Sequence, residues 1–98
     1  MCRVRGFAVV MTSLLICACA SLPIQEMSDA RQAISAARDA GAEQFAVTAF
    51  SEAERLLDVA ESALERKDYE SSRKAAVEAK KQAVIARGEA LAEQELTE

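Results

Sequence analysis

From residue 26 onward the chain is an almost unbroken series of helix-favouring residues, and this run constrains the fold more than any other feature. Ala, Glu, Lys, Arg, Gln and Leu dominate, and within the run Gly occurs only at Gly41 and Gly88. These side chains cost little when a helix forms. We therefore predict an all-α fold, a small antiparallel three-helix bundle in which a helical hairpin packs with a short N-terminal helix.

The first two helices are expected over residues 26–40 and 48–66. In the first, residues three and four apart form one apolar face: Met27, Ala30, Ile34 and Ala37. Gly41 stands where a helix-terminating glycine is expected. Residues 42–47 should form a connection or a loose extra turn, with Phe45 closing the end of the core. In the second helix, Ser51 to Glu54 has the form of a capping box, and its apolar face is Phe50, Ala53, Leu57, Ala60 and Leu64.

The third helix is expected over residues 69–95, with Asp68 as its N-cap. One stripe along it consists mainly of small residues: Tyr69, Ala76, Ala79, Ala83, Ala86 and Ala90. A second stripe, about 120° round the helix, consists of Val77, Val84 and Leu91, and two stripes predict contacts with two neighbouring helices. Lys80 and Arg87 lie between the stripes, so that their stems can cover apolar surface. Together with Val77, Val84 and Leu91, they are the candidate contact surface.

The N-terminus predicts an export signal. Arg3 and Arg5 precede an apolar segment from Phe7 to Ala18, which is too short for a permanent membrane span and typical of a secretory signal peptide. The small Ala18 directly precedes Cys19, and this arrangement resembles a bacterial lipobox. Cys17 fits less well, because the bulky Ile16 precedes it.

This resemblance implies cleavage between Ala18 and Cys19, diacylglyceryl transfer to the Cys19 thiol and acylation of the new amino terminus. The expected organisation is a signal peptide at 1–18, a lipidated tether at 19–25 and a helical domain at 26–98. Since no Asp follows Cys19, similar lipoproteins are sorted to the outer membrane of Gram-negative bacteria, facing the periplasm. An ordinary signal peptide and an uncleaved anchor are the alternatives.

The body also resembles a family of bacterial lipoproteins called domain of unknown function 4398. The matching segments are Ser28 to Ile34, Ala37 to Ala42, Glu52 to Leu57, and Lys67 to Glu70 followed by spaced alanines through Ala86. Relatives often carry Pro in the second connection, where this chain has Val47 and Thr48. The resemblance implies a short envelope lipoprotein, and no activity comes with it.

Catalytic chemistry finds little support in the sequence. The chain has no His, the commonest general base and metal ligand. Ser71 and Ser72 lie near Lys74, but a charged helical surface explains them better than a Ser–Lys pair. Carboxylate pairs such as Glu52/Glu54 and Glu61/Glu65 lack the bulky residues needed to build a cleft. We expect no enzyme activity, no cofactor and no metal.

Partners are expected in the envelope. The net charge of -4 argues against nucleic acid. A lipid-anchored domain that acts by contact with an envelope protein is the leading hypothesis. The alternatives are a structural spacer that self-associates through the alanine stripe, a tetratricopeptide-like peptide-binding module, and an envelope enzyme or accessory factor. A weak basic patch for an anionic polymer would consist of Arg73, Lys74, Lys80, Lys81 and Arg87.

Overall fold

The structure is a computed structural model that describes residues 22–97, and in this part of the chain every element is a helix. Three helices are long: α2 (Ile24–Asp39), α4 (Val47–Glu65) and α5 (Tyr69–Thr97); a fourth, α3 (Ala42–Phe45), is a single turn. The all-α prediction is confirmed. The described residues form four helices rather than the three expected, because the connection at 42–47 contains the extra turn.

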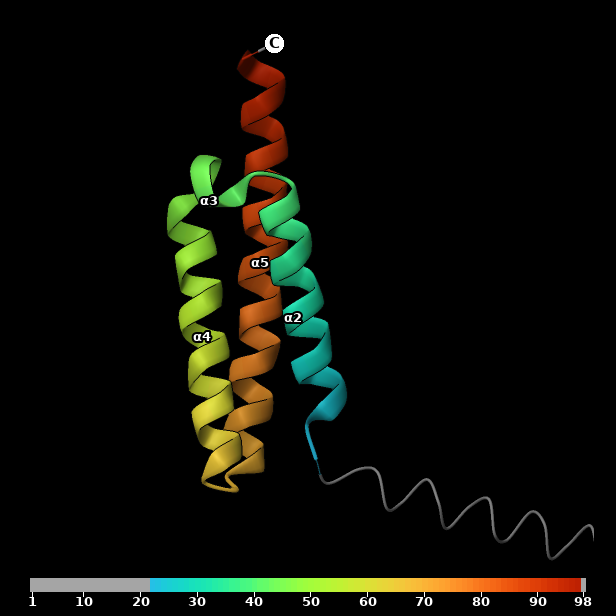
Figure 1. Ribbon diagram of the computed structural model, residues 1–98, viewed down its shortest axis with the longest axis vertical. Coiled ribbons are helices and arrows are strands. Elements are labelled where there is room, and N and C mark those ends of the chain that lie inside the picture. The colour runs from blue at the N-terminus through green and yellow to red at the C-terminus, as the bar shows by residue number, and fades with distance from the viewer. Residues whose placement is uncertain (1–21, 98) are drawn as a thin grey trace, which may run out of the picture.

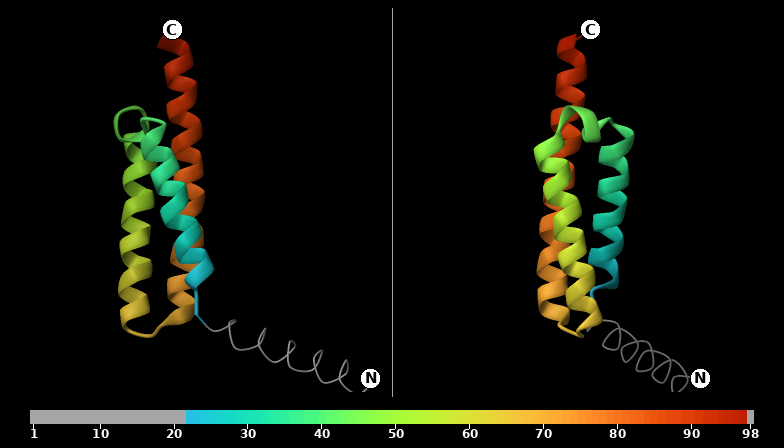
Figure 2. Two further views of the ribbon diagram at one scale, coloured as in Figure 1. Left: turned by 45° about the vertical axis from the view of Figure 1, so that its right-hand side comes forward. Right: turned by 60° about the vertical axis from the view of Figure 1, so that its left-hand side comes forward.

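The three long helices lie side by side, and α3 crosses near one end of them (Figure 1). α4 runs opposite to α2 and α5 in both further views (Figure 2). α5 is the central element, because α2 and α4 each pack mainly against it and meet one another at few points. The last turns of α5 extend past α3, away from the end at which α2 begins.

α2 begins two residues earlier than the sequence predicted. Pro23 is buried at its N-cap, and the Pro23 carbonyl accepts the first helical hydrogen bond from the Met27 N–H at 3.0 Å. Ile24 and Gln25, which the sequence assigned to the predicted tether over 19–25, are therefore part of α2. At its other end α2 stops at Gly41, whose φ of 87° lies in the left-handed region that favours glycine.

The predicted capping box of the second helix is wrong. α4 starts at Val47 after Ala46, which makes no side-chain cap, and Ser51 lies inside the helix. Without a proline in the connection, the helix extends backward to the end of α3. By contrast Asp68 does cap α5: its carboxylate accepts the Ser71 N–H at 3.3 Å.

The core consists mostly of alanine. The upper part is built round Ile34 and Phe50, with Phe45 packed against it, and the lower part round Met27; Leu57 contacts both. α5 contributes one broad face of small buried residues to both parts: Ser72, Ala75, Ala76, Ala79, Ala83, Ala86 and Ala90. Small side chains let the helix backbones approach closely, so α5 contacts both α2 and α4 through this single face.

Candidate contact surface

The second apolar stripe of α5 points away from the other helices. Val77, Val84 and Leu91 are 38%, 57% and 42% exposed, and Ile85 beside them is 47% exposed. The prediction that this stripe contacts a second helix within the molecule is wrong, since the alanine face makes both sets of contacts. We call Val77, Val84, Ile85 and Leu91 the outer strip of α5.

Basic residues border the outer strip. A shallow hollow on α5 is lined by two of its valines, Ile85 and two lysines: Val77, Lys80, Lys81, Val84 and Ile85. Lys81 pairs with Glu78 at 3.2 Å on the exposed surface, and Arg87 is exposed one turn further along. The residues that the sequence proposed as a contact surface are thus solvent-exposed along one side of α5.

The alanine stripe, in contrast, is not available to a partner. Ala76, Ala79, Ala83, Ala86 and Ala90 have no exposed surface at all. Because they fill the space between α5 and its two neighbours, self-association through this stripe would require the fold to open. Any pairing of two copies must use another face.

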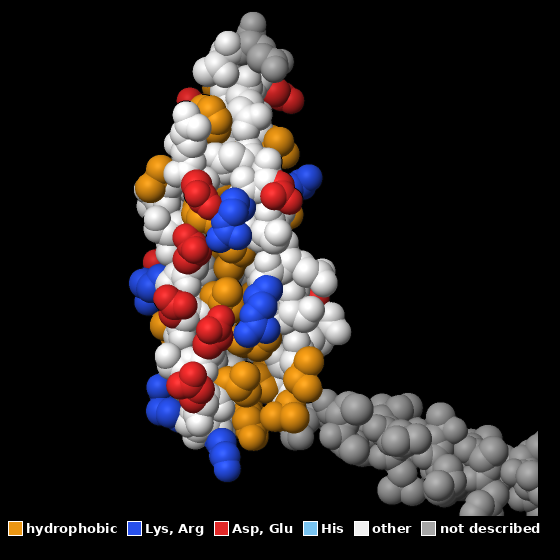
Figure 3. All heavy atoms as spheres, in the orientation of Figure 1, with side chains coloured by type: hydrophobic (Ala, Val, Ile, Leu, Met, Phe, Trp, Pro, Cys, Tyr) orange, Lys and Arg blue, Asp and Glu red, His pale blue; other side chains and the backbone are white. Residues whose placement is uncertain are grey.

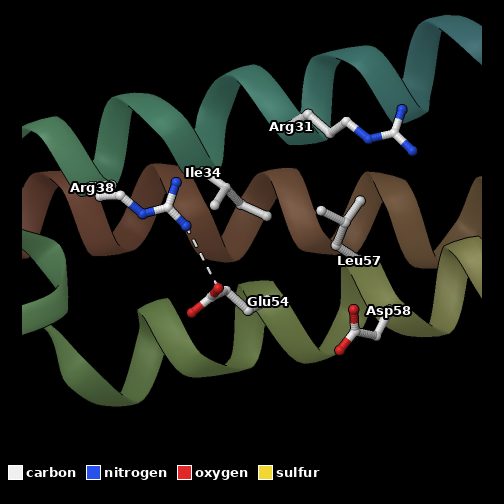
Figure 4. Close-up of a pocket in the computed structure, with 6 residues that line it drawn as sticks. All are labelled: Arg31, Ile34, Arg38, Glu54, Leu57 and Asp58. Carbon is white, nitrogen blue, oxygen red and sulfur yellow. Dashed lines mark ion pairs between the residues drawn. The ribbon is translucent and has the colours of Figure 1, made fainter.

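A second concave feature is a groove between α2 and α4, of about 250 Å³ (Figure 4). Ile34 and Leu57 lie at its centre, with arginines on the α2 side and acidic residues on the α4 side. Arg38 contacts Glu54 at 3.6 Å across the groove, and Arg31 contacts Glu61, which is not one of its lining residues, at 3.7 Å. Figure 3 shows hydrophobic side chains between these two charged borders. The Arg38–Glu54 ion pair therefore spans an open groove.

Ser72 differs from the solvated serine that the sequence suggested. Its side chain is fully buried, and its hydroxyl donates to the Ala60 carbonyl at 2.8 Å, with the Met27 sulfur 3.8 Å away. Ser72 therefore joins α5 to α4 and α2 at one point. A hydroxyl held in this way by a backbone carbonyl is a structural contact.

The four candidate carboxylates are exposed or partly exposed, and three of them are paired with arginines. Two hydrogen bonds join Glu52 to Arg55, and they lower the pKa of the Glu52 carboxyl. Glu54 and Glu61 contact the arginines of α2.

Gln94 makes a contact between helices that the sequence did not predict. Its side-chain amide on α5 donates to the Ala40 carbonyl at the end of α2. Glutamine on an exposed helix gives no pattern by which such a partner 54 residues away could be recognised. The contact fastens the end of α2 to α5 just below the protruding turns.

Ala18 and Cys19, the predicted cleavage and lipidation site, lie outside the described residues. Among residues 22–97, no cluster of three or more acidic, cysteine or histidine side chains is suited to hold a metal ion. In the same part of the chain, none of the helices combines the length and the hydrophobicity needed to span a bilayer.

These features define an all-helical protein with an alanine core and an exposed apolar strip on its longest helix. The chain belongs to the family described as Domain of unknown function (DUF4398), whose model matches residues 25–98. The match begins one residue after the start of α2 and includes all of α3, α4 and α5. Comparison with curated proteins and with solved structures gave no significant match.

Proposed function

We propose that this chain is a non-enzymatic outer-membrane lipoprotein, anchored through lipid on Cys19, that acts on the periplasmic side by contact with another envelope protein. The lipobox resemblance at Ala18 and Cys19 supports the anchor. In this proposal the anchor carries a small helical bundle, which consists of three long helices and the one-turn α3.

The outer strip of α5 is the observation that carries the contact role. Four large apolar side chains along one side of a single helix are more than the scattered exposed residues of an ordinary surface. The aliphatic stems and terminal ammonium groups of Lys80 and Lys81 border them, which suits a partner that presents an apolar ridge with acidic edges. We propose that the outer strip binds this partner.

The anchor is tested by labelling cells with radioactive palmitate. We expect label in the parent chain and none in Cys19→Ser. Label that persists in Cys19→Ser would contradict the assignment of the lipid to this residue.

The contact role is tested with a photoreactive amino acid at position 84, compared with position 59. Val59 on α4 is also a half-exposed valine, at 41%, and is the matched control. We expect a discrete cross-linked species from position 84 and not from 59. Equal cross-linking from both would refute a role of the outer strip, and a product of twice the chain's mass would favour the self-associating spacer.

A further inference from the structure

One end of the molecule combines exposed apolar and basic side chains. Leu22, the first described residue, and Ile24 are 42% and 69% exposed. Arg66 and Lys67 are exposed in the turn between α4 and α5. We call these four residues the base of the molecule.

The contacts of Ser72 and Arg73 show that the parts of the base lie at the same end. Ser72, in the first turn of α5, contacts Ala60 of α4 and Met27 of α2. Arg73 binds Glu26 at 3.3 Å, which again joins the start of α5 to the start of α2. Figure 3 shows hydrophobic side chains gathered at this end, next to the point where the described chain begins.

The segment between the base and the proposed anchor is short. Because α2 starts at Ile24 and Pro23 is buried, only residues 20–22 separate Cys19 from the folded body. Three residues reach about 10 Å when fully extended. The headgroup region on one side of a bilayer is itself roughly 5–7 Å thick. A lipid on Cys19 therefore holds the base within reach of the headgroups.

We propose that the base is a membrane-contact surface that docks on phospholipid headgroups and holds the helices away from the bilayer. This inference rests on the proposed lipid anchor. Leu22 and Ile24 enter the boundary between headgroups and acyl chains, as the apolar residues of interfacial segments do. Arg66 and Lys67 face anionic headgroups.

The position of the anchor, rather than a difference in charge sign, gives the docking its direction, because Glu65, Asp68 and Glu70 are exposed beside the two cations of the base. Glu43 on α3 and Glu93 and Glu95 on the protruding part of α5 are exposed at the opposite end. An anionic lipid surface repels these carboxylates, whereas at the base its attraction to Arg66 and Lys67 offsets its repulsion of the neighbouring carboxylates. The outer strip, which runs along α5, then stands clear of the bilayer.

The test uses the lipidated full-length protein in vesicles of phosphatidylethanolamine and phosphatidylglycerol that contain lipid with a quencher in its acyl chains. A fluorescent label is attached to Arg66→Cys in the base or to Leu96→Cys at the far end, where Leu96 is 82% exposed. Position 66 is on the α4–α5 turn, 47 residues from the anchor in sequence, so its quenching reports the placement of the body rather than of the tether.

We expect several-fold stronger quenching at position 66 than at position 96. In the label-66 protein, Leu22→Asp with Ile24→Asp should reduce the quenching several-fold while the protein still floats with the vesicles. Both replaced side chains are exposed, and an unchanged helical circular dichroism signal checks that the fold is retained.

The three possible failures are distinguishable. Protein that floats with the vesicles but shows equal quenching at 66 and 96 overturns the docking and leaves the anchor intact. Protein that does not float overturns the anchor and the docking with it. Quenching at 66 that is unaffected by the two aspartates refutes the role of Leu22 and Ile24.

Discussion

At the scale of single residues, this fold depends on a few positions that need a particular backbone conformation or a particular hydrogen-bond partner. Gly41 adopts a left-handed φ and allows the chain to leave α2. Asp68 caps α5, and Ser72 joins three helices at a buried point. Each of these residues acts through a backbone group: its own backbone at Gly41, the Ser71 N–H at Asp68 and the Ala60 carbonyl at Ser72.

The two glycines should respond to alanine in opposite directions. A Cβ at Gly41 would meet the Gln94 amide at 2.9 Å in a left-handed conformation, so Gly41→Ala should lower the free energy of unfolding by about 1–2 kcal/mol. A Cβ at Gly88 meets nothing within 4 Å, so Gly88→Ala should raise it by about 1 kcal/mol. Urea unfolding of both variants measures this, and equal signs would contradict it.

Asp68 makes stability depend on pH. Hydrogen bonds from Ser71 hold the pKa of the Asp68 carboxyl below its ordinary value of 3.8. Because the pKa is lower in the folded state, the charged cap stabilises the fold above the unfolded value, and this contribution is lost as the pH falls through the folded value. Thermal unfolding between pH 6 and pH 3 should show a smaller decrease in Asp68→Ser, which keeps a neutral cap. An unchanged pH dependence would argue against this role.

At the scale of the helix, α5 determines the architecture. Its buried face consists of alanines and one serine, so two neighbours fit against it, while its valines point outward. The size of each side chain, and not its hydrophobicity alone, decides which side of α5 is internal.

Substitutions at neighbouring positions on α5 should therefore have very different effects on stability. Ala83 has no exposed surface, and Ala83→Leu should destabilise the protein by about 1–3 kcal/mol because the larger side chain has no space. Val84→Asp, at a position 57% exposed, should change stability by less than about 0.5 kcal/mol. Chemical denaturation compares the two, and a larger loss in Val84→Asp would show that the outer strip is internal.

At the scale of the whole molecule, buried alanine faces hold the helices together, and ion pairs lie at the solvent-exposed edges of the helix contacts. The pairs that join α2 to α4, Arg38–Glu54 and Arg31–Glu61, are about half exposed. Water and salt screen such pairs, and each contributes at most about 1 kcal/mol.

Salt should consequently have a small effect on unfolding. We expect the thermal midpoint to move by only a few degrees between low and high sodium chloride, and Arg31→Ala with Arg38→Ala to behave similarly. A collapse of the midpoint in high salt would mean that the charged groove between α2 and α4 carries the stability.

Helix-favouring composition was sufficient to predict an all-helical protein, and spacing was sufficient to identify the buried face of α2. For α4 the spacing was right in part: Leu57 and Leu64 are only partly buried, and the buried Ala49 and Ala63 were not predicted. Gly41 and Asp68 marked real boundaries because each acts through its neighbours in sequence. The capping box at Ser51 failed because nothing local stops α4 from starting earlier. The family, too, was recognisable from the order of these segments.

The places where helices form follow from local sequence, since helix formation depends on residues within a few positions of one another. Packing between the helices sets which stripe of α5 is internal, buries Ser72 and brings Gln94 to the end of α2. These outcomes depend on the volume available between elements far apart in sequence, and the period of a helix carries no information about that volume.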